Sequence, residues 1–301
     1  MTTRKGSSWK DAFLSGIERG SWAEAISVLD SQKTGHAGTP RQAVKLQAVK
    51  VMERHFGEAT SARYEAAMAF ANSGSEGAQE VGLVLLGHMF GHNPREVTDV
   101  ILRLADSENW EVREWAASAL RRVISENFAA IFPTIRAWAV HASPNVRRAA
   151  AVASAWAAGD CTEGECELLL EALTPLLEDD DPYVRKNLGA YAIGDSFLKA
   201  QPALVAGWLD RASSHPRAQW NVAMALSAAE AAKHLALLSG LLRKVAADER
   251  TAVRRAVYRA VLNLWKRVPE EVNSVVEGWK DDPERRHVFD HVKEKVGEGG
   301  S

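Results

Sequence analysis

The chain has 301 residues, of which 46% are hydrophobic and 25% are charged, and its formal net charge is −2. A chain of this length and composition buries a sizeable core, which excludes a disordered protein. No window approaches the roughly 18 consecutive apolar residues that a membrane helix needs, and no apolar run follows the basic first residues. We therefore expect a cytoplasmic protein with no membrane partner. The near-neutral charge argues against coating nucleic acid through bulk charge, although a local basic track remains compatible with it.

A short element recurs along the whole chain. Four copies contain proline and align without a gap, namely SPNVRRA, DPYVRKN, HPRAQWN and DPERRHV, and looser copies lack the proline. We call the residue three positions after the proline, or the equivalent residue of a looser copy, the marker of that copy. The markers are Lys45, Gln79, Arg113, Arg147, Arg185, Gln219, Arg254 and Arg286. Neighbouring markers are 34, 34, 34, 38, 34, 35 and 32 residues apart. A period this regular is typical of a solenoid of stacked repeats.

Each repeat is predicted to be a pair of helices. In the stretch PREVTDVILRLADSENWEVREWAASALRRVISENF, apolar residues recur at helical spacing in both halves, and DSEN supplies turn and cap chemistry between them. Proline suits the first position of the second helix, because a residue there has no intrahelical use for its N–H. No stretch alternates with period two, so we predict an all-α fold. We expect a single domain over residues 1–301 with about eight helix pairs and a frayed tail at 297–301.

The residues that most often bind metals give no site. Cys161 and Cys166 lie in the acidic segment GDCTEGECE, with no second pair and no nearby histidine, so we expect free thiols. Histidines 141, 215 and 234 do not form i, i+4 pairs with another histidine or with a cysteine. The glycine-containing stretches do not follow a strand, so they predict no phosphate-binding loop. We expect neither a metal nor a cofactor.

Three segments resemble a known family. NWEVREWAASALRRV, SPNVRRAAAVAS and DPYVRKNLGAYAIGDSFLKAQP together resemble the HEAT-like DNA alkylation repair glycosylases, the AlkD and AlkC group, over residues 75–265. The resemblance implies a C-shaped, right-handed α-solenoid whose second helices line a concave face that holds duplex DNA. It also implies an enzyme that removes N3- and N7-alkylated purines from that DNA. We expect it to act as a monomer.

The chemistry that this resemblance implies needs few groups. An alkylated N3 or N7 makes the purine cationic, so its glycosidic bond is already weakened and the departing base needs no general acid. A carboxylate near the sugar would stabilise the oxocarbenium-like centre and would orient or deprotonate the attacking water. An aromatic ring facing the cationic base would add about 0.5 to 2 kcal/mol by cation–π attraction.

The family's catalytic pattern can be carried over residue by residue. Its tryptophan matches Trp110, and its carboxylate, an aspartate in the family, matches Glu114. Glu111 lies in the same helical turn and is the second candidate carboxylate. These three residues are the predicted catalytic group.

The resemblance also implies residues that contact DNA. The family's arginine matches Arg148, and its second aromatic falls on Ala190 without a gap or on Tyr191 with one inserted residue. We favour Tyr191, because residues 184–202 are one longer than the family pattern. Residues one position after each marker rotate about 100° around the helix and are better placed than the markers to reach phosphates. The expected DNA-binding residues are Arg148, Lys186, Tyr191, Asp195, Trp220 and Arg255.

Each of these residues also has a structural interpretation. Trp110 could anchor a turn, Trp220 could fill the core between repeats, and the glutamates of the first turn could merely offset the helix dipole. Marker arginines could bond to acids or carbonyls of the adjacent repeat. The functional alternatives are a non-catalytic HEAT scaffold that binds a protein, and a relative that binds DNA without catalysis. Clustered cations beside a carboxylate would favour DNA, whereas a mixed or apolar groove would favour a protein.

Overall fold

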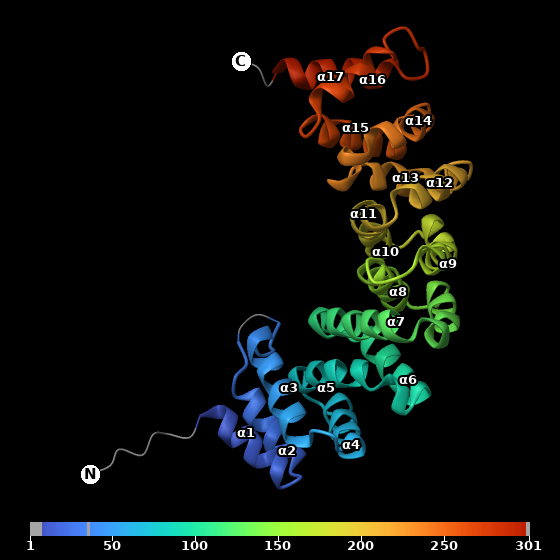
Figure 1. Cartoon of the computed structure of the whole chain (residues 1–301). Helices are drawn as coiled ribbons and strands as arrows, with labels where there is room; N and C mark the ends of the chain where they lie inside the picture. The colour runs from blue at the N-terminus through green and yellow to red at the C-terminus, as the bar shows by residue number, and fades with distance from the viewer. Residues whose placement is uncertain (1–7, 35–36, 299–301) are drawn as a thin grey trace. The chain divides into compact units, whose positions relative to one another are not determined.

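The structure, a computed structural model, describes residues 8–34 and 37–298 (Figure 1). It divides into two compact units, Met1–Ile131 and Phe132–Ser301, which we call the N-terminal and C-terminal units. Among the described residues, the only strand-like pairing is one isolated bridge between Lys33 and Pro40. The predicted all-α solenoid is therefore confirmed, whereas its C-shaped course stays a prediction. Of the predicted tail at 297–301, residues 299–301 lie outside the described residues, and the last helix continues to Glu298.

The N-terminal unit is a stack of helices that pack through small residues. Its elements are α1 (Trp9–Glu18), α2 (Trp22–Asp30), α3 (Gln42–Phe56), α4 (Thr60–Ala71), α5 (Glu76–His88), the 3₁₀ turn η1 (Phe90–His92), α6 (Pro94–Ala105) and the start of α7 (Trp110–Ala139). Gly82 lets α5 approach α4, because a Cβ there would lie 2.5 Å from the backbone nitrogen of Ala71. α7 is interrupted at Asn127, where φ is −141° and ψ is 40°, so it consists of two consecutive helices.

The C-terminal unit is built from two layers of helices. Its elements after α7 are α8 (Pro144–Ala157), α9 (Glu163–Leu173), η2 (Thr174–Glu178), α10 (Pro182–Asn187), the π-helix η3 (Leu188–Phe197), α11 (Leu198–Ala200), α12 (Pro202–Ala212), η4 (Pro216–Ala218), α13 (Gln219–Leu226), η5 (Glu230–His234), α14 (Leu235–Val245), α15 (Thr251–Trp265), α16 (Pro269–Glu277) and α17 (Arg286–Glu298). The helices α8, α10 with η3, α13, α15 and α17 are neighbours in that order, and we call them the second-helix layer. The helices α9, α12, α14 and α16 form the first-helix layer.

The marker residues define where the second helices begin. In seven repeats the second helix starts three residues before the marker, at Gln42, Glu76, Trp110, Pro144, Pro182, Pro216 and Thr251, the sixth as a 3₁₀ turn. The eighth, α17, starts at its marker Arg286 instead, because Pro283 lies in the preceding turn. The predicted prolines at the first helical turn are confirmed at 144, 182 and 216.

The marker side chains hold the turn between the two helices of a repeat. Five of them donate a hydrogen bond to the carbonyl oxygen six residues earlier, over 2.9, 2.7, 2.8, 3.0 and 3.2 Å for Gln79, Arg113, Arg147, Gln219 and Arg254. Carbonyl groups near the end of a helix lack an intrahelical donor, and the marker supplies one. Most markers therefore bond within their own repeat, which explains why arginine and glutamine both occur there.

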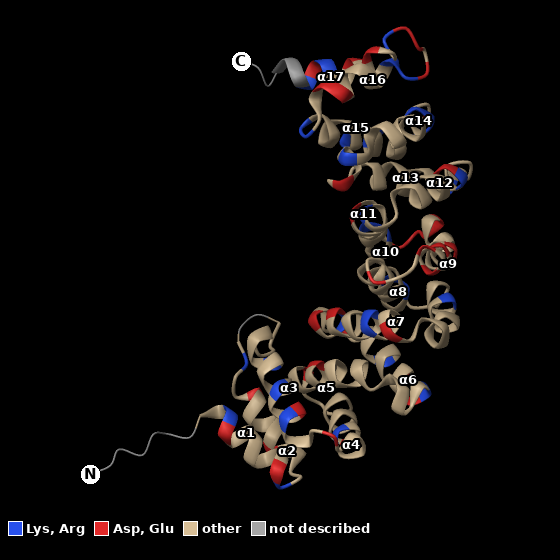
Figure 2. Ribbon diagram, viewed as in Figure 1, with Lys and Arg blue, Asp and Glu red and all other residues tan. Residues whose placement is uncertain are grey.

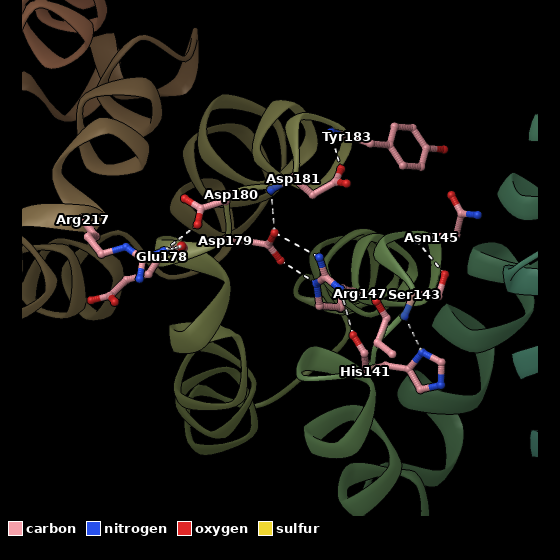
Figure 3. A network of polar contacts seen from close by, with 11 residues as sticks. His141, Ser143, Asn145, Arg147, Glu178, Asp179, Asp180, Asp181, Tyr183 and Arg217 are labelled. Atoms are coloured by element: carbon pink, nitrogen blue, oxygen red, sulfur yellow. Dashed lines mark hydrogen bonds and ion pairs between the residues drawn. The ribbon is translucent and has the colours of Figure 1, made fainter.

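The marker Arg147 also connects neighbouring repeats (Figure 3). The Arg147 guanidinium binds the Asp179 carboxylate through Nε at 2.6 Å and Nη2 at 3.1 Å, a two-point contact of the strong, charge-assisted kind. Asp179 also accepts the backbone N–H of Asp181 at 2.9 Å. Asp181 and Ser143 in turn cap α10 and α8 through the backbone N–H groups two residues on. These contacts fix the starting points of two successive second helices.

Candidate functional site

The predicted catalytic residues lie in the first turns of α7, in the N-terminal unit. Asn109 caps the helix, since its Oδ1 accepts the backbone N–H of Glu111 at 2.9 Å. Trp110 is 46% exposed, which is high for a large apolar side chain. Glu114 follows four residues later, on the same side of the helix, and is half-buried. An exposed indole and a carboxylate are therefore neighbours, as the sequence predicts.

Glu111 belongs to a different environment from Glu114. Its side chain is only 16% exposed, and its Oε1 lies 2.6 Å from the Lys45 ammonium. Its Oε2 accepts the Thr39 hydroxyl at 2.7 Å. The two candidate carboxylates thus differ: Glu111 is committed to contacts inside the N-terminal unit, and Glu114 is the one beside Trp110.

The Lys45 contacts form a buried ionic cluster of Lys45, Glu80, Glu111 and Thr39. Both Lys45 and Glu80 are fully buried, and the ammonium lies 2.5 Å from Glu80 Oε2 and 3.2 Å from the Thr39 hydroxyl oxygen. The Lys45 nitrogen also lies 5.1 Å from the centre of the Trp115 ring. The ammonium therefore donates hydrogen bonds to Thr39 and Glu111 and forms an ion pair with Glu80. The cluster joins α3, α5 and the start of α7.

The cluster contains one cation and two carboxylates, and burial makes full ionisation costly. The pKa of Glu80 is raised from 4.5 to about 7, chiefly by burial and also by the charges of Glu111 and Glu76, while the bond and charge of Lys45 lower it. Glu80 therefore takes up and releases its proton near neutral pH.

The predicted DNA-binding residues all lie in the C-terminal unit, and their exposure differs. Arg148 is only 5% exposed, and its guanidinium lies 5.4 Å from the centre of the Tyr183 ring, between α8 and α10. This placement favours a structural role over a phosphate contact. Trp220 is half-buried, and the Arg185 guanidinium lies over its ring at 4.2 Å. Asp195 accepts the backbone N–H of Glu230 at 3.3 Å and so supports the start of η5.

Lys186 and Arg255 are exposed, as their positions after the markers predict. Arg259 lies four residues after Arg255 and is also exposed, so the two guanidinium groups share one face of α15. Within residues 8–34 and 37–298, these three cations form neither a hydrogen bond nor an ion pair. We call Lys186, Arg255 and Arg259 the open cations.

Charge is divided between the two layers of the C-terminal unit. The second helices α8, α10, α13 and α15 contain seven Lys or Arg residues and no Asp or Glu, as their sequences show. The first helices α9 and α16 contain only acidic charged residues. Figure 2 shows this contrast most clearly between α15 and α9. A net charge near zero therefore conceals three basic second helices, α8, α10 and α15. The division is not complete, since α17 contains three cations and three carboxylates, and α14 contains Arg243 and Lys244.

Tyr191 projects from the π-helix η3 and is 40% exposed. Its hydroxyl accepts a hydrogen bond from Trp156 Nε1 on α8 at 2.5 Å. A π-helix holds more residues per turn than an α-helix, so it accommodates the extra residue expected in this segment. Gly189 and Gly194 allow η3 to lie against α13, because a Cβ at either would come within 2.7 Å of α13 or its following turn.

Two residues and one contact were not predicted from the sequence. Arg259 could have been found from its i, i+4 spacing to Arg255. Trp156 carries no signal that would link it to Tyr191, because the two residues are 35 positions apart. The contact of Lys45 with Glu111 spans 66 positions and has no local signal either.

The predicted site residues fall into two groups, one in each unit. Trp110, Glu111 and Glu114 lie together in the N-terminal unit, and the open cations with Tyr191 lie in the C-terminal unit. Across the described part of the chain, no three His, Cys, Asp or Glu side chains are arranged to hold a metal ion. No single described helix is long and apolar enough to span a membrane, although the bent pair Pro216–Leu226 and Glu230–Val245, at 94°, reaches that length and composition together.

Comparison with known proteins supports the repeat architecture. Residues 97–194 match the family model of HEAT repeats. This segment is therefore similar to HEAT repeats, and it lies within the all-α solenoid. The matched HEAT region contains Trp110, Glu114, Arg148, Lys186 and Tyr191. It does not extend to Arg255 and Arg259.

The other comparisons add no function. No curated protein matches the chain. Crystal structures of three engineered proteins from the Northeast Structural Genomics Consortium match at 17%, 18% and 19% identity, with TM-scores of 0.30, 0.28 and 0.27. They cover 96%, 80% and 72% of this chain, and this chain covers 93%, 98% and 96% of theirs. At these TM-scores the likeness carries no argument, and no match points to the AlkD and AlkC group.

Proposed function

We propose that this protein binds duplex DNA on its second helices between about residues 110 and 260 and excises cationic N3- or N7-alkylated purines. The observation that carries the proposal is the set of three open cations, Lys186, Arg255 and Arg259, on second helices without a carboxylate. Exposed cations without protein partners are available to phosphates, and each phosphate neutralised releases counterions. The exposed ring of Tyr191 in the same layer adds a surface on which a base can stack.

The excision step is assigned to Glu114 and Trp110. A carboxylate near the sugar stabilises positive charge that develops as the glycosidic bond breaks, and it orients the attacking water. The indole faces the cationic base and attracts it through its π-electrons. Glu111 is excluded from this role, because its oxygens are engaged by Lys45 and Thr39. It is instead a residue that positions the start of α7.

Base release from alkylated duplex DNA tests the proposal. The full-length chain is incubated with a duplex that carries 7-methylguanine or N3-methyladenine, and the free base and the abasic sites are quantified. We expect release by the wild type and a loss of about 10²- to 10³-fold in rate for Glu114→Gln. Absence of release, together with absent or salt-independent duplex binding, would reject the proposed function. Release at the same rate by Glu114→Gln would reject the residue assignment alone.

A second candidate is a scaffold that binds a protein, and one observation favours it. A hollow of 590 Å³ lies between α14 and α16 in the first-helix layer, lined by apolar residues such as Leu235 and Val275 and by the charged residues Lys233, Glu270 and Glu271. Such a mixed lining is more typical of a protein partner than of DNA. The scaffold function would be favoured if the chain neither bound duplex DNA nor released a base.

A further inference from the structure

The turn between α8 and α9 brings the only two cysteines of the chain together. Thr162 caps α9, since its hydroxyl oxygen accepts the Glu165 backbone N–H at 3.3 Å, and the Glu165 carboxylate accepts the Thr162 backbone N–H at 2.8 Å. This reciprocal pair is a capping box. In such a motif the residue before the cap packs against the fourth residue of the helix. Here these two residues are Cys161 and Cys166.

The two cysteines occupy paired positions of the capping box, and only Cys161 is accessible. The capping box places Cys161 directly before the cap and Cys166 at the fourth helical position, the two positions whose side chains pack together. Cys166 is fully buried, and its thiol donates to the Ala158 carbonyl at the end of α8 over 3.3 Å. Cys161 is partly exposed, so it is the sulfur that a small dissolved molecule can reach. Both thiols are free.

We propose that Cys161 and Cys166 are a redox-active dithiol, which a hydroperoxide converts reversibly into an intramolecular disulfide. The capping box fixes the short loop between the two residues and keeps the sulfur atoms adjacent. Two thiols that are held close together form a disulfide faster than two distant thiols, which must first come into contact. The inference goes beyond the proposed DNA function and does not depend on it.

The reaction balances in two steps. The Cys161 sulfur attacks one oxygen of the hydroperoxide, the O–O bond breaks, and a sulfenic acid forms while the second oxygen leaves as water or an alcohol. The Cys166 sulfur then attacks the sulfenic sulfur, the S–S bond forms, and the sulfenic oxygen leaves as water. The two sulfurs together supply the two electrons that the peroxide accepts. A dithiol reductant reverses the product by exchange.

Ionisation assigns different roles to the two sulfurs. The neighbouring Cys161 thiol lowers the pKa of the Cys166 thiol, whereas the neighbouring Cys166, burial and the charges of Glu165 and Asp160 raise the pKa of Cys161. The reactive form of a cysteine is its thiolate. Oxidation of Cys161 should therefore accelerate as the pH rises.

Mass spectrometry of the folded, full-length chain tests this inference. The chain is exposed to hydrogen peroxide, denatured and alkylated with N-ethylmaleimide. We expect a monomer lighter by about 2 Da that takes up no maleimide, and one that takes up two after treatment with dithiothreitol. Retention of both reactive thiols would overturn the proposal. So would a product that gains oxygen or forms a dimer without losing about 2 Da as a monomer.

Variants show whether the folded turn is responsible. Cys161→Ser and Cys166→Ala retain one thiol each, so neither should give the lighter monomer. Thr162→Ala removes the cap oxygen and should slow disulfide formation several-fold, because the sulfurs are no longer held together. Thr98→Ala is the matched control, since the Thr98 hydroxyl only donates to the Pro94 carbonyl of an unrelated helix. Equal rates in the wild type and in Thr162→Ala would contradict the proposal.

Discussion

Replacing Glu80 with glutamine removes the group that titrates in the buried ionic cluster of the N-terminal unit. In the unfolded chain Glu80 loses its proton near pH 4.5, whereas in the folded chain it keeps the proton until about pH 7. Between these values the unfolded state binds fewer protons, so the free energy of unfolding falls as the pH rises. The contribution is fully present below pH 4.5 and is lost above pH 7. Its size is about 3 kcal/mol, since each pH unit corresponds to about 1.4 kcal/mol.

The groups that face Glu80 explain why its pKa is raised and therefore why the free energy of unfolding falls as the pH rises. Burial outweighs the attraction of Lys45 from α3, and the carboxylates of Glu111 from α7 and Glu76 from α5 add to the effect of burial. Glutamine cannot ionise, so Glu80→Gln should lack this loss of stability between pH 4.5 and 7. We therefore expect the stability of the wild type relative to Glu80→Gln to fall by about 3 kcal/mol across that interval.

Urea unfolding at several pH values between 4.5 and 8.5 measures this difference. Hydrogen exchange of the α5 amides assigns the transition to the N-terminal unit, because a repeat protein can unfold in more than one step. Glu58→Gln is the matched control, since Glu58 is exposed and its substitution should leave the pH profile unchanged. A difference between wild type and Glu80→Gln that stays constant or grows with pH would refute the reasoning.

Two further predictions concern stability and activity together. Glu111→Gln weakens a contact with the buried Lys45 and should lower the free energy of unfolding by about 2 kcal/mol, whereas Glu114→Gln should lower base release. Thermal melts beside the release assay check this, and a Glu111→Gln variant that melts at the wild-type temperature would contradict it. Gly194→Ala should destabilise by at least about 2 kcal/mol, because its Cβ would lie 2.4 Å from the Ala225 carbonyl oxygen. Gly240→Ala, in an open helical position, should be neutral or stabilising in the same urea titration.

The sequence was sufficient to predict the repeats, but it was not sufficient to predict the environment of each side chain. The period and the proline positions predict where second helices begin, because these are local features of each turn. The expectation that residues after the markers are exposed holds for Lys186 and Arg255 and does not hold for Arg148. Around Arg148, the residues Ala149 to Ala153 are all buried, so α8 is covered on every side. A rotation of about 100° cannot expose a side chain on such a helix.

The candidate site was likewise predictable from the sequence only where it depends on local spacing. The i, i+4 spacing is sufficient to place Glu114 beside Trp110. The engagement of Glu111 depends on Lys45, which lies 66 positions earlier, and only the tertiary structure reveals that pairing. The close packing of the π-helix η3 could not be predicted from the sequence either. Its glycines allow the helix to contact α13, and no local pattern indicates that contact.

The division of charge between layers reconciles a net charge near zero with the proposed DNA-binding surface. Acids concentrate in α9 and α16, and cations in α8, α10 and α15. An average over the chain cancels these two surfaces. DNA would meet only one of them, so the layer and not the whole chain sets the electrostatic contribution to binding.

The salt dependence of duplex binding tests the central claim most directly. Fluorescence anisotropy with a labelled duplex gives the association constant over a range of salt concentrations for the wild type and for a variant in which Lys186, Arg255 and Arg259 are all glutamine. If each open cation neutralises one phosphate, the log–log slope should become shallower by about 2.7, since each phosphate contributes about 0.9. The control variant replaces Arg136, Arg211 and Lys280 with glutamine. It makes the same change in charge outside the second-helix layer, so it should keep the wild-type slope. An unchanged slope in the first variant, or no salt-dependent binding by the wild type, would contradict the account.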